Sequence, residues 1–353
     1  MANVLIFGAG AVGQFMGFLM TRANKHKVTM VGKYDHYDVI KLKGLNIRRQ
    51  GKEDYVKAFN FLPSSDRIPR DEKFDWVFMT VKAYELTKSL KEIAHFITAN
   101  TKVLLFQMGV GSHEVVTKII PEDRLFLATL TANVAIIQQG TLVETNKGGG
   151  ICVAPVMLRN NLSELCSILS GIDMEIRTFE DWKPMKWSAL LYEMLLNGQC
   201  GLIDYTPEKV LSSAPLFELE LDAFIEAMNV VKAIGVEPID LPAYPIKKLM
   251  FYAKFPGFLQ MPMFKGLLVK KDSVKVPTIK NDMDKGRKGT EIGFINGAVG
   301  RWGKERGIRT PVNDFLTDEL VKIVIGKRLW DVYRKKPEEE LDCYHFYKLN
   351  YVR

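Results

Sequence analysis

The stretch VLIFGAGAVGQFMGFLM, from Val4 to Met20, contains no charged residue and decides how the rest of the chain is interpreted. It begins with a short apolar run that is typical of a buried strand and continues through a glycine-containing turn into a helical pattern. The glycines match G-x-G-x-x-G, as Gly8, Gly10 and Gly13. A strand, a tight turn and a helix in this order are typical of a dinucleotide-binding unit, in which the helix amino end faces a diphosphate.

Two other interpretations of this stretch, a signal peptide and a membrane span, are disfavoured. A signal peptide carries positive charge ahead of its apolar run, whereas only Met1-Ala2-Asn3 precede the run here. A membrane span takes about 20 apolar residues, and glycines interrupt this shorter run. We therefore expect the turn to bind a cofactor diphosphate through the consecutive residues Gly8, Ala9, Gly10, Ala11, Val12 and Gly13.

The composition favours a globular protein of two domains. The chain has 353 residues, and about 150 residues per domain gives two. Hydrophobic residues make up 47% and charged residues 25%, which disfavours disorder. The four cysteines are scattered and form no C-x-x-C pair, so we expect neither a disulfide framework nor a metal site. This cysteine usage favours a reduced, cytoplasmic setting.

The second expected strand, KVTMVGK, ends at Lys33. Enzymes that prefer NAD usually end this strand with an acidic residue that binds the ribose 2′-hydroxyl, whereas a basic residue accommodates the 2′-phosphate of NADP. Lys33 therefore favours NADPH/NADP+ as the cofactor. The alternative is a solvated loop lysine.

Strands and helices then alternate along the chain. A strand is expected at Trp76–Val81, followed by Lys82 and a helix, and another at Val103–Phe106, followed by Met108 and a glycine turn. Alternation at this spacing predicts a doubly wound parallel sheet. Because ligands bind at the carboxyl ends of such strands, we expect Lys82 and Met108 to face the cofactor.

Near Trp182 the pattern changes to long, apolar-striped helical segments. We therefore expect an α/β protein with an N-terminal Rossmann doubly wound parallel sheet and an all-helical C-terminal domain. The expected ranges are 1–178 for cofactor binding, 179–326 for substrate binding and dimerisation, and 327–353 for a C-terminal extension. This extension holds Trp330 and five tyrosines and phenylalanines, so we expect it to pack against its own domain or a partner subunit.

Positive charge is concentrated between residues 244 and 288, which hold 11 Lys/Arg and 3 Asp/Glu. Phenylalanines, a tyrosine and methionines are interleaved with these charges. A membrane surface, nucleic acid or an acidic substrate could be the partner of such a segment. We favour helices whose lysines face water while the aromatic side chains cover the active site, because Pro256 and Pro262 break any long amphipathic helix. No nucleic-acid-binding module accompanies the charge, so nucleic acid is the least favoured partner.

Several of these features together resemble the ketopantoate reductase family, also called 2-dehydropantoate 2-reductases. They are VLIFGAGAVG, Lys33, TVKAYE around Lys82, KGTEIGFINGAV at 288–299 and RGIRTPVND at 306–314. The likeness runs from residue 2 to about residue 325. It implies a Rossmann domain and a helical domain that use NADPH to reduce the ketone of a 2-oxo acid. It also implies a homodimer, because members of the family are often dimers.

The resemblance further implies a general acid, since hydride arrival at a ketone carbon makes an alkoxide. In the family this acid is a lysine early in the first helix of the second domain, with asparagines four and eight residues later on the same helix face. Placing the last asparagine on Asn197 puts the first on Glu193 and the lysine on Ala189, which cannot donate a proton. Lys186, one turn earlier, could replace the family lysine, and so could Glu193 if burial raises its pKa.

Three more positions follow from the resemblance. Met108 stands where the family has an asparagine near the nicotinamide and the substrate. Glu291 keeps a carboxylate that helps to hold substrate and cofactor, and Thr278 keeps the hydroxyl of a substrate-binding serine. The resulting candidates for catalysis are Lys186, Glu193, Asn197 and Glu291, and those for substrate binding are Asn197 and Thr278.

The altered positions bear on the substrate. Replacing a lysine by Ala189 and an asparagine by Glu193 moves the charge by two toward negative, where the family holds an anionic 2-oxo acid. Two unit charges at about 4 Å interact by roughly 4 kcal/mol at an effective dielectric of 20. We therefore favour a neutral or cationic carbonyl or imine substrate, slightly over ketopantoate itself. The alternative function is a catalytically silent NADP(H)-binding sensor or scaffold.

Overall fold

The computed structural model describes residues 1–32, 34–57, 60–270, 273–274 and 277–351. These residues form two compact units, the first of residues 1–107 and 112–185 and the second of residues 108–111 and 186–353. The chain enters the second unit within helix α6 (Trp182–Met194). The domain boundaries that we expect at residues 178 and 326 stay predictions.

An eight-stranded sheet forms the centre of the first unit, in the order β12-β11-β8-β7-β6-β1-β2-β5. Within this order, the run β8-β7-β6-β1-β2-β5 pairs in parallel throughout. Strand β11 pairs antiparallel with β8. The chain order reverses between β1 and β6, which is the switch point of a doubly wound sheet. The strands are β1 (Asn3–Phe7), β2 (Lys27–Val31), β5 (Asn60–Leu62), β6 (Trp76–Met79), β7 (Lys102–Leu105), β8 (Leu125–Leu130), β11 (Gly150–Pro155) and β12 (Glu175–Thr178).

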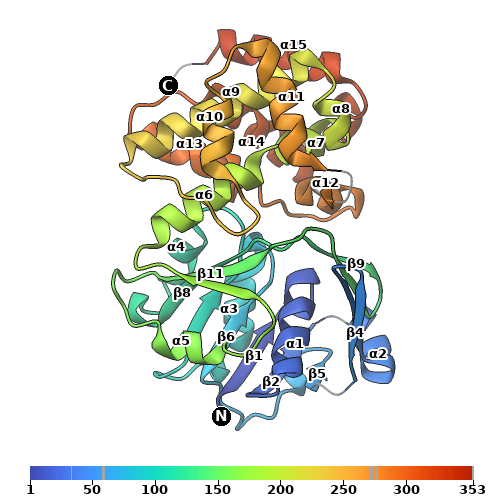
Figure 1. Cartoon of the computed structure of the whole chain (residues 1–353), viewed down its shortest axis with the longest axis vertical. Coiled ribbons are helices and arrows are strands. Elements are labelled where there is room, and N and C mark those ends of the chain that lie inside the picture. The colour runs from blue at the N-terminus through green and yellow to red at the C-terminus, as the bar shows by residue number, and fades with distance from the viewer. Residues whose placement is uncertain (33, 58–59, 271–272, 275–276, 352–353) are drawn as a thin grey trace. The chain divides into compact units, whose positions relative to one another are not determined.

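Helices pack on this sheet, as Figure 1 shows for α1, α3 and α5. The apolar pattern of β1 explains the packing, because Val4 and Ile6 belong to the same buried cluster as side chains of α1 and α5. Burial of each such side chain contributes about 1.5–3 kcal/mol. The helices of this unit are α1 (Ala11–Ala23), α2 (Tyr34–Lys43), α3 (Leu86–Ile93), α4 (Ser112–Val116) and α5 (Ser163–Ile168), with 3₁₀ turns at Ser65–Arg67, Ala83–Glu85, Ala94–Phe96 and Glu122–Arg124.

The first unit also contains a second, four-stranded sheet that we did not predict from the sequence. Its order is β4-β3-β10-β9, with β3 (Leu45–Arg49), β4 (Lys52–Val56), β9 (Val134–Gln138) and β10 (Thr141–Glu144). Arg49 Nε donates to Glu144 Oε2 at 2.6 Å, and the Arg49 guanidinium lies over the Phe15 ring of α1 at 5.7 Å. These contacts fix the small sheet to the first helix of the unit.

In its described residues, the second unit is built of helices and one short two-stranded antiparallel sheet. This agrees with the α/β plus helical architecture expected from the sequence. No helix in the described ranges is both long enough and apolar enough to cross a bilayer. The elements are α7 (Gly198–Ile203), α8 (Pro207–Val210), α9 (Ala214–Ala233), α10 (Ile246–Tyr252), α11 (Gly257–Leu268), β13 (Val269–Lys270), β14 (Ser273–Val274), α12 (Thr278–Asp284), η5 (Ile292–Phe294), α13 (Asn296–Glu305), α14 (Pro311–Val324), η6 (Trp330–Val332) and α15 (Pro337–Leu349).

The C-terminal extension packs against its own unit, one of the two outcomes expected. The indole nitrogen of Trp330 donates to the carbonyl of Leu202 at 2.8 Å. Glu340 is completely buried and accepts a hydrogen bond from Gln199 Nε2 at 3.2 Å. Burial raises the pKa of this carboxyl well above its usual value, which favours its neutral form. The extension is therefore part of the helical core.

Asp204 ties the extension to α7 and α12. It ends α7 in the left-handed conformation (φ 54°) and contacts Lys280, Arg334 and Lys335, with Arg334 Nε at 3.1 Å and Lys335 Nζ at 3.0 Å. Burial alone would raise the pKa of Asp204, but its bonds from these three cations outweigh the burial and lower the pKa to about 2. The ionised form of Asp204 therefore stabilises the folded unit.

Replacing Asp204 by asparagine should destabilise the protein by about 1–2 kcal/mol near neutral pH, after allowance for solvent screening. The folded-state pKa is below the unfolded one, so the stabilisation is present above pH about 4 and is lost as the pH falls toward 2. Thermal unfolding of Asp204→Asn and wild type across this range measures the difference. Asp284→Asn is the control, because Asp284 also pairs with Lys280 but is more exposed. Equal shifts in the two variants would contradict the role of Asp204.

Candidate functional site

The turn after β1 depends on two glycines that approach neighbouring backbone closely. Gly8 has φ 116°, and a Cβ there would lie 2.7 Å from the amide nitrogen of Val81. A Cβ on Gly13 would lie 1.8 Å from the Gly8 carbonyl oxygen and 2.7 Å from Thr80 Oγ1. The Thr80 hydroxyl also donates to the Gly8 carbonyl at 2.7 Å. Any other residue at position 8 or 13 would therefore push the first helix away from the ends of β1 and β6.

Gly10 has a different environment. It is exposed, and a Cβ there would meet nothing within 4 Å. It is the N-cap of α1, directly before Ala11. The amides in the first turn of a helix have no carbonyl one turn earlier, so they point outward from the helix end without a partner inside the helix. Gln14 Nε2 holds the preceding backbone through the Ala9 carbonyl at 2.8 Å. The open backbone at Gly10 and the positive end of α1 fit a diphosphate.

Other predicted cofactor residues lie near the same ends of the strands. Lys82 follows β6 and begins the next 3₁₀ turn, close along the chain to Thr80. Gln107, after β7, donates to the carbonyls of Met79 and Val81 at 2.9 Å each, so it joins the ends of β6 and β7. Lys33 lies outside the described residues.

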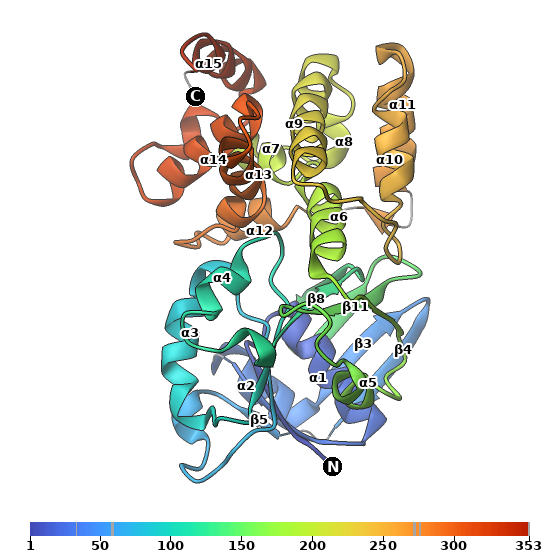
Figure 2. The ribbon, with the colours of Figure 1, turned by 90° about the vertical axis from the view of Figure 1, so that its left-hand side faces the viewer.

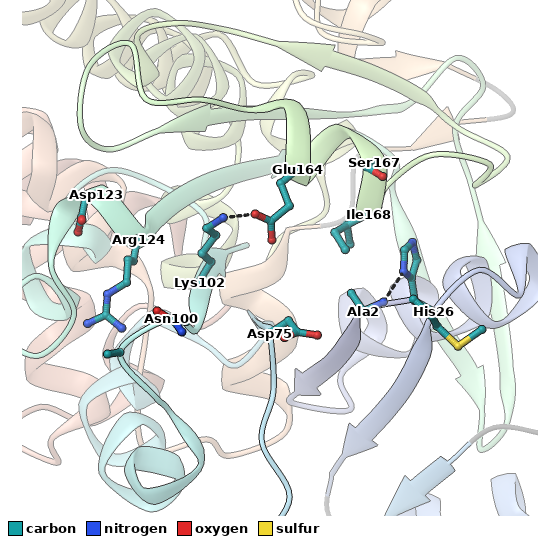
Figure 3. Close-up of a pocket in the computed structure, with 12 residues that line it drawn as sticks. Ala2, His26, Asp75, Asn100, Lys102, Asp123, Arg124, Glu164, Ser167 and Ile168 are labelled. Carbon is teal, nitrogen blue, oxygen red and sulfur yellow. Dashed lines mark hydrogen bonds and ion pairs between the residues drawn. The ribbon is translucent and has the colours of Figure 1, made fainter.

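A cavity of about 780 Å³ lies at the opposite ends of these strands, and Figure 3 shows its lining. Lys102 at the start of β7 reaches Glu164 of α5, whereas His26 lies just ahead of β2 and accepts a bond from the Ala2 amide at 3.3 Å. Cations and carboxylates line it together. Ligands of doubly wound sheets bind at the carboxyl ends of the strands, so this cavity is not the candidate cofactor site.

In the second unit, Lys186 is the central group of the candidate catalytic cluster. Its side chain is only 3% exposed, although it is a lysine at the start of the unit. Burial lowers the pKa of Lys186 to about 8, and the nearby carboxylates of Glu193 and Glu291 oppose that shift. Glu193 lies seven residues after Lys186 in α6, so both side chains lie on one face of the helix. Glu291 is buried next to η5.

Tyr244 completes this cluster and was not assigned to the site from the sequence. Its hydroxyl donates to Glu193 Oε1, and its ring stacks on Tyr192 with centroids 3.9 Å apart. Tyr244 is the first aromatic residue of the basic segment, and it is 2% exposed. One aromatic side chain of that segment thus contacts Glu193 of the candidate site. The contact could not be read from the sequence, because 51 residues separate the partners.

Asn197 and Thr278 also meet. Asn197 Nδ2 donates to Thr278 Oγ1 at 3.2 Å, and Asn197 Oδ1 accepts from the amide of Ile279 at 3.0 Å. The Thr278 hydroxyl also lies 3.8 Å from the Met108 sulfur. The buried Asn197 amide therefore holds the first turn of α12, and the Thr278 hydroxyl lies between Asn197 and Met108.

The helix that carries these groups is interrupted, contrary to the continuous helix assumed for the sequence register. α6 ends at Met194 and α7 begins at Gly198. Between them Leu196 has φ 63°, and its amide donates to Glu220 Oε1 at 2.7 Å. Counting back from Asn197 in steps of four therefore does not follow one helix face. The break removes the structural reason for placing the family lysine on Ala189.

The segment Met108–Gly111 supports the position of Glu291. The Val110 amide donates to the Phe294 carbonyl at 2.8 Å, and Gly109 approaches so closely that a Cβ would lie 1.9 Å from the same oxygen. Phe294 ends η5, whose preceding residue is Glu291. The glycine turn seen in the sequence thus packs against the motif that carries Glu291.

Comparison with protein families gives two matches that follow the two parts of the chain. Residues 4–155 match the profile of the ketopantoate reductase PanE/ApbA family, and residues 181–323 match the profile of its C-terminal domain. The 2-dehydropantoate 2-reductase of Lactococcus lactis is 24% identical over 333 residues, which cover 91% of this chain and 99% of that protein. The 2-dehydropantoate 2-reductase of Streptococcus pyogenes is 25% identical over 322 residues, which cover 89% of this chain and 95% of that protein.

Solved structures share the fold. The 2-dehydropantoate 2-reductase from Geobacter metallireducens superposes with a TM-score of 0.75 at 20% identity, covering 90% of this chain and 98% of that one. D-mandelate dehydrogenase in a ternary structure with NADH and anilino(oxo)acetate superposes with a TM-score of 0.74 at 19% identity. The superposition covers 97% of this chain and 99% of that one. At this identity the likeness shows the fold.

Replacing Gly10 by alanine should weaken binding of NADPH at least about tenfold, because the methyl group enters the space that fits a diphosphate. The loss of a capping glycine should cost at most about 1 kcal/mol of stability. Calorimetric titration with NADPH and with NADH, together with thermal unfolding, measures both effects. Gly266→Ala, in α11 with equally open surroundings, is the control; it should leave the affinity for NADPH unchanged, and as a substitution inside a helix it should stabilise the fold by up to about 1 kcal/mol. Unchanged affinity in the Gly10 variant would contradict the assignment of the turn.

Proposed function

The chain belongs to the ketopantoate reductase family, and from that premise we propose that it is an NADPH-dependent reductase of a small carbonyl or imine substrate. The family uses a nicotinamide cofactor, and the open turn at Gly10 fits its diphosphate. The observation that carries the proposal is the burial of Lys186 beside Glu193 and Glu291. A buried amine among carboxylates is costly and serves well as a proton donor.

Lys186 acts as the general acid of this reaction. When bound, the reduced nicotinamide supplies a hydride. The ammonium of Lys186 then gives its proton to the substrate oxygen or nitrogen on which negative charge develops. With a pKa of about 8 the group is protonated at neutral pH and still releases a proton readily. The Glu193 and Glu291 carboxylates keep the lysine charged in a buried position.

The remaining candidates hold and orient the substrate. Asn197 fixes the first turn of α12, so it positions the Thr278 hydroxyl. Thr278 offers this hydroxyl to the substrate, beside the Met108 sulfur. Ala189 is buried in α6 and supplies no polar group. In this assignment Lys186 performs the role of the family lysine, and the break at Leu196 accounts for its longer spacing to Asn197.

The preference for NADPH over NADH rests on Lys33, which follows β2 by two residues in the sequence, where a basic residue suits a 2′-phosphate. Lys82, after β6, is a further candidate contact with the cofactor. We also expect a cytoplasmic homodimer, as the family resemblance implies.

The substrate class follows from the charges around Lys186. One ammonium faces two carboxylates, so the cluster carries a net charge of −1 when all three groups are ionised. The Tyr244 hydroxyl donates to Glu193 Oε1 and so holds this carboxyl group in position. An anionic 2-oxo acid is repelled by this cluster, whereas a neutral or cationic carbonyl or imine is not. This supports an altered substrate over ketopantoate.

Replacing Lys186 by methionine should lower kcat about 100-fold or more, because a general acid contributes roughly that much. In the wild type, kcat for reduction should fall as the pH rises above about 8, since deprotonated Lys186 has no proton to give. NADPH oxidation with a panel of 2-oxo acids, neutral ketones and imines measures both.

Lys183→Met is the matched control on the same helix, and the exposed Lys183 should leave kcat unchanged. The Lys186 variant leaves Glu193 and Glu291 without their buried cation, so thermal unfolding and NADPH affinity are measured beside kcat to separate a loss of stability from the loss of the proton donor. Wild-type activity that the Lys186 variant retains would refute the acid role. Cofactor binding without turnover on any substrate of the panel would instead support the silent sensor or scaffold.

Replacing Glu193 by glutamine should raise kcat/KM for ketopantoate about tenfold, because it removes one negative charge near the substrate. Activity on neutral carbonyl compounds should change less. Tyr244→Phe separates charge from geometry, since it removes the hydrogen bond to Glu193 but leaves the carboxylate. Steady-state kinetics on both substrate classes provide the comparison. Efficient wild-type reduction of ketopantoate, with no gain in the Glu193 variant, would contradict the charge argument.

A further inference from the structure

Four aromatic side chains lie around the turn between α10 and α11, and we call Phe251, Tyr252, Phe255 and Phe258 the aromatic corner. Phe251 is 57% exposed and Phe258 is 78% exposed. The ring of Phe255 meets that of Phe251 edge-on, with centroids 5.0 Å apart, and lies 6.3 Å from that of Tyr252. From the sequence we expect aromatic side chains that cover the active site, whereas Phe251 and Phe258 face solvent.

The segment that forms the corner carries positive charge and no negative charge. Between residues 245 and 268 there are four lysines, no arginine and no acidic residue. These lysines are Lys247, Lys248, Lys254 and Lys265, and all four are exposed. Lys248 lies over the Tyr252 ring at 5.6 Å. The Asp240 carboxylate just ahead of α10 accepts from the Lys247 backbone amide at 2.8 Å, so it caps the start of this helix.

The two helices are attached to the unit by their other face. Phe264 of α11 is 1% exposed and packs edge-on against Phe217 and Phe224 of α9, with centroids 5.7 and 5.9 Å apart. Gln260 donates to the Ala253 carbonyl at 2.9 Å and closes the turn between α10 and α11. Figure 2 shows α10 and α11 together at one edge of the helical unit. The exposed phenylalanines are therefore not needed for the core.

We propose that the aromatic corner docks on a membrane surface that carries anionic lipids. Exposed aromatic rings insert at the boundary of headgroups and acyl chains, while lysines around them meet lipid phosphates. Pro256 and Pro262 prevent one long in-plane helix, so the contact is made by the corner. A second copy of the chain is a poorer occupant, because it would bring four more lysines against these four.

The test is co-sedimentation of the full-length protein with vesicles of phosphatidylcholine alone and of phosphatidylcholine with phosphatidylserine. We expect retention on the anionic vesicles only, and release when the salt concentration rises. Lys247→Gln/Lys248→Gln should weaken the binding about tenfold or more. Phe251→Ser/Phe258→Ser should also weaken it, without loss of thermal stability, because both rings are exposed.

Lys304→Gln/Lys327→Gln is the matched control, since both lysines are exposed elsewhere in the same unit. This control should bind the vesicles nearly as well as the wild type. Absence of binding to anionic vesicles at physiological salt would overturn the proposal. So would an equal loss of binding in the control, or light scattering that shows the phenylalanine variant turning a dimer into monomers. None of these outcomes depends on reductase activity.

Discussion

The close approach of Gly8 and Gly13 to the ends of β1 and β6 is the constraint on which the first unit depends. A Cβ on Gly13 would lie 1.8 Å from the Gly8 carbonyl, so only glycine lets α1 start at this point. Thr80, directly after the neighbouring strand β6, closes the turn by donating to the same carbonyl. The same geometry leaves Gly10 open and directs the positive end of α1 outward. One steric constraint thus sets both the packing of the sheet and the fit to a diphosphate.

The second unit contains a different and less favourable arrangement, a lysine buried among carboxylates. Burial of Lys186 is unfavourable on its own, and the unit compensates with Glu193 and Glu291. Each of these is held in place. Glu193 accepts a hydrogen bond from Tyr244, and Glu291 directly precedes η5, whose last residue accepts a hydrogen bond from the amide of Val110. Such a cluster is hard to explain by stability alone. We propose that it serves proton transfer, which needs an amine whose pKa lies near the working pH.

Most of the fold could be predicted from local sequence patterns. The turn at Gly8–Gly13 was predictable because its glycines answer steric demands within a few residues, and the change to helices near Trp182 follows from periodicity. The small sheet was missed because β3 pairs with β10, which is distant in the chain. The break at Leu196 was missed because leucine gives no signal for a positive φ. That break changes the helix register, so counting along the sequence could not choose between Ala189 and Lys186. The preference for NADPH stays a prediction from Lys33.

Transfer of deuterium from the cofactor to a substrate tests the central claim most directly. The protein would be incubated with NADPH deuterated at C4 of the nicotinamide and a panel of 2-oxo acids, neutral ketones and imines. The masses of the products would be measured by mass spectrometry. We predict a reduced product that carries one deuterium on the former carbonyl or imine carbon, with neutral or cationic substrates preferred. Tight cofactor binding with no labelled product from any substrate would contradict the reductase assignment.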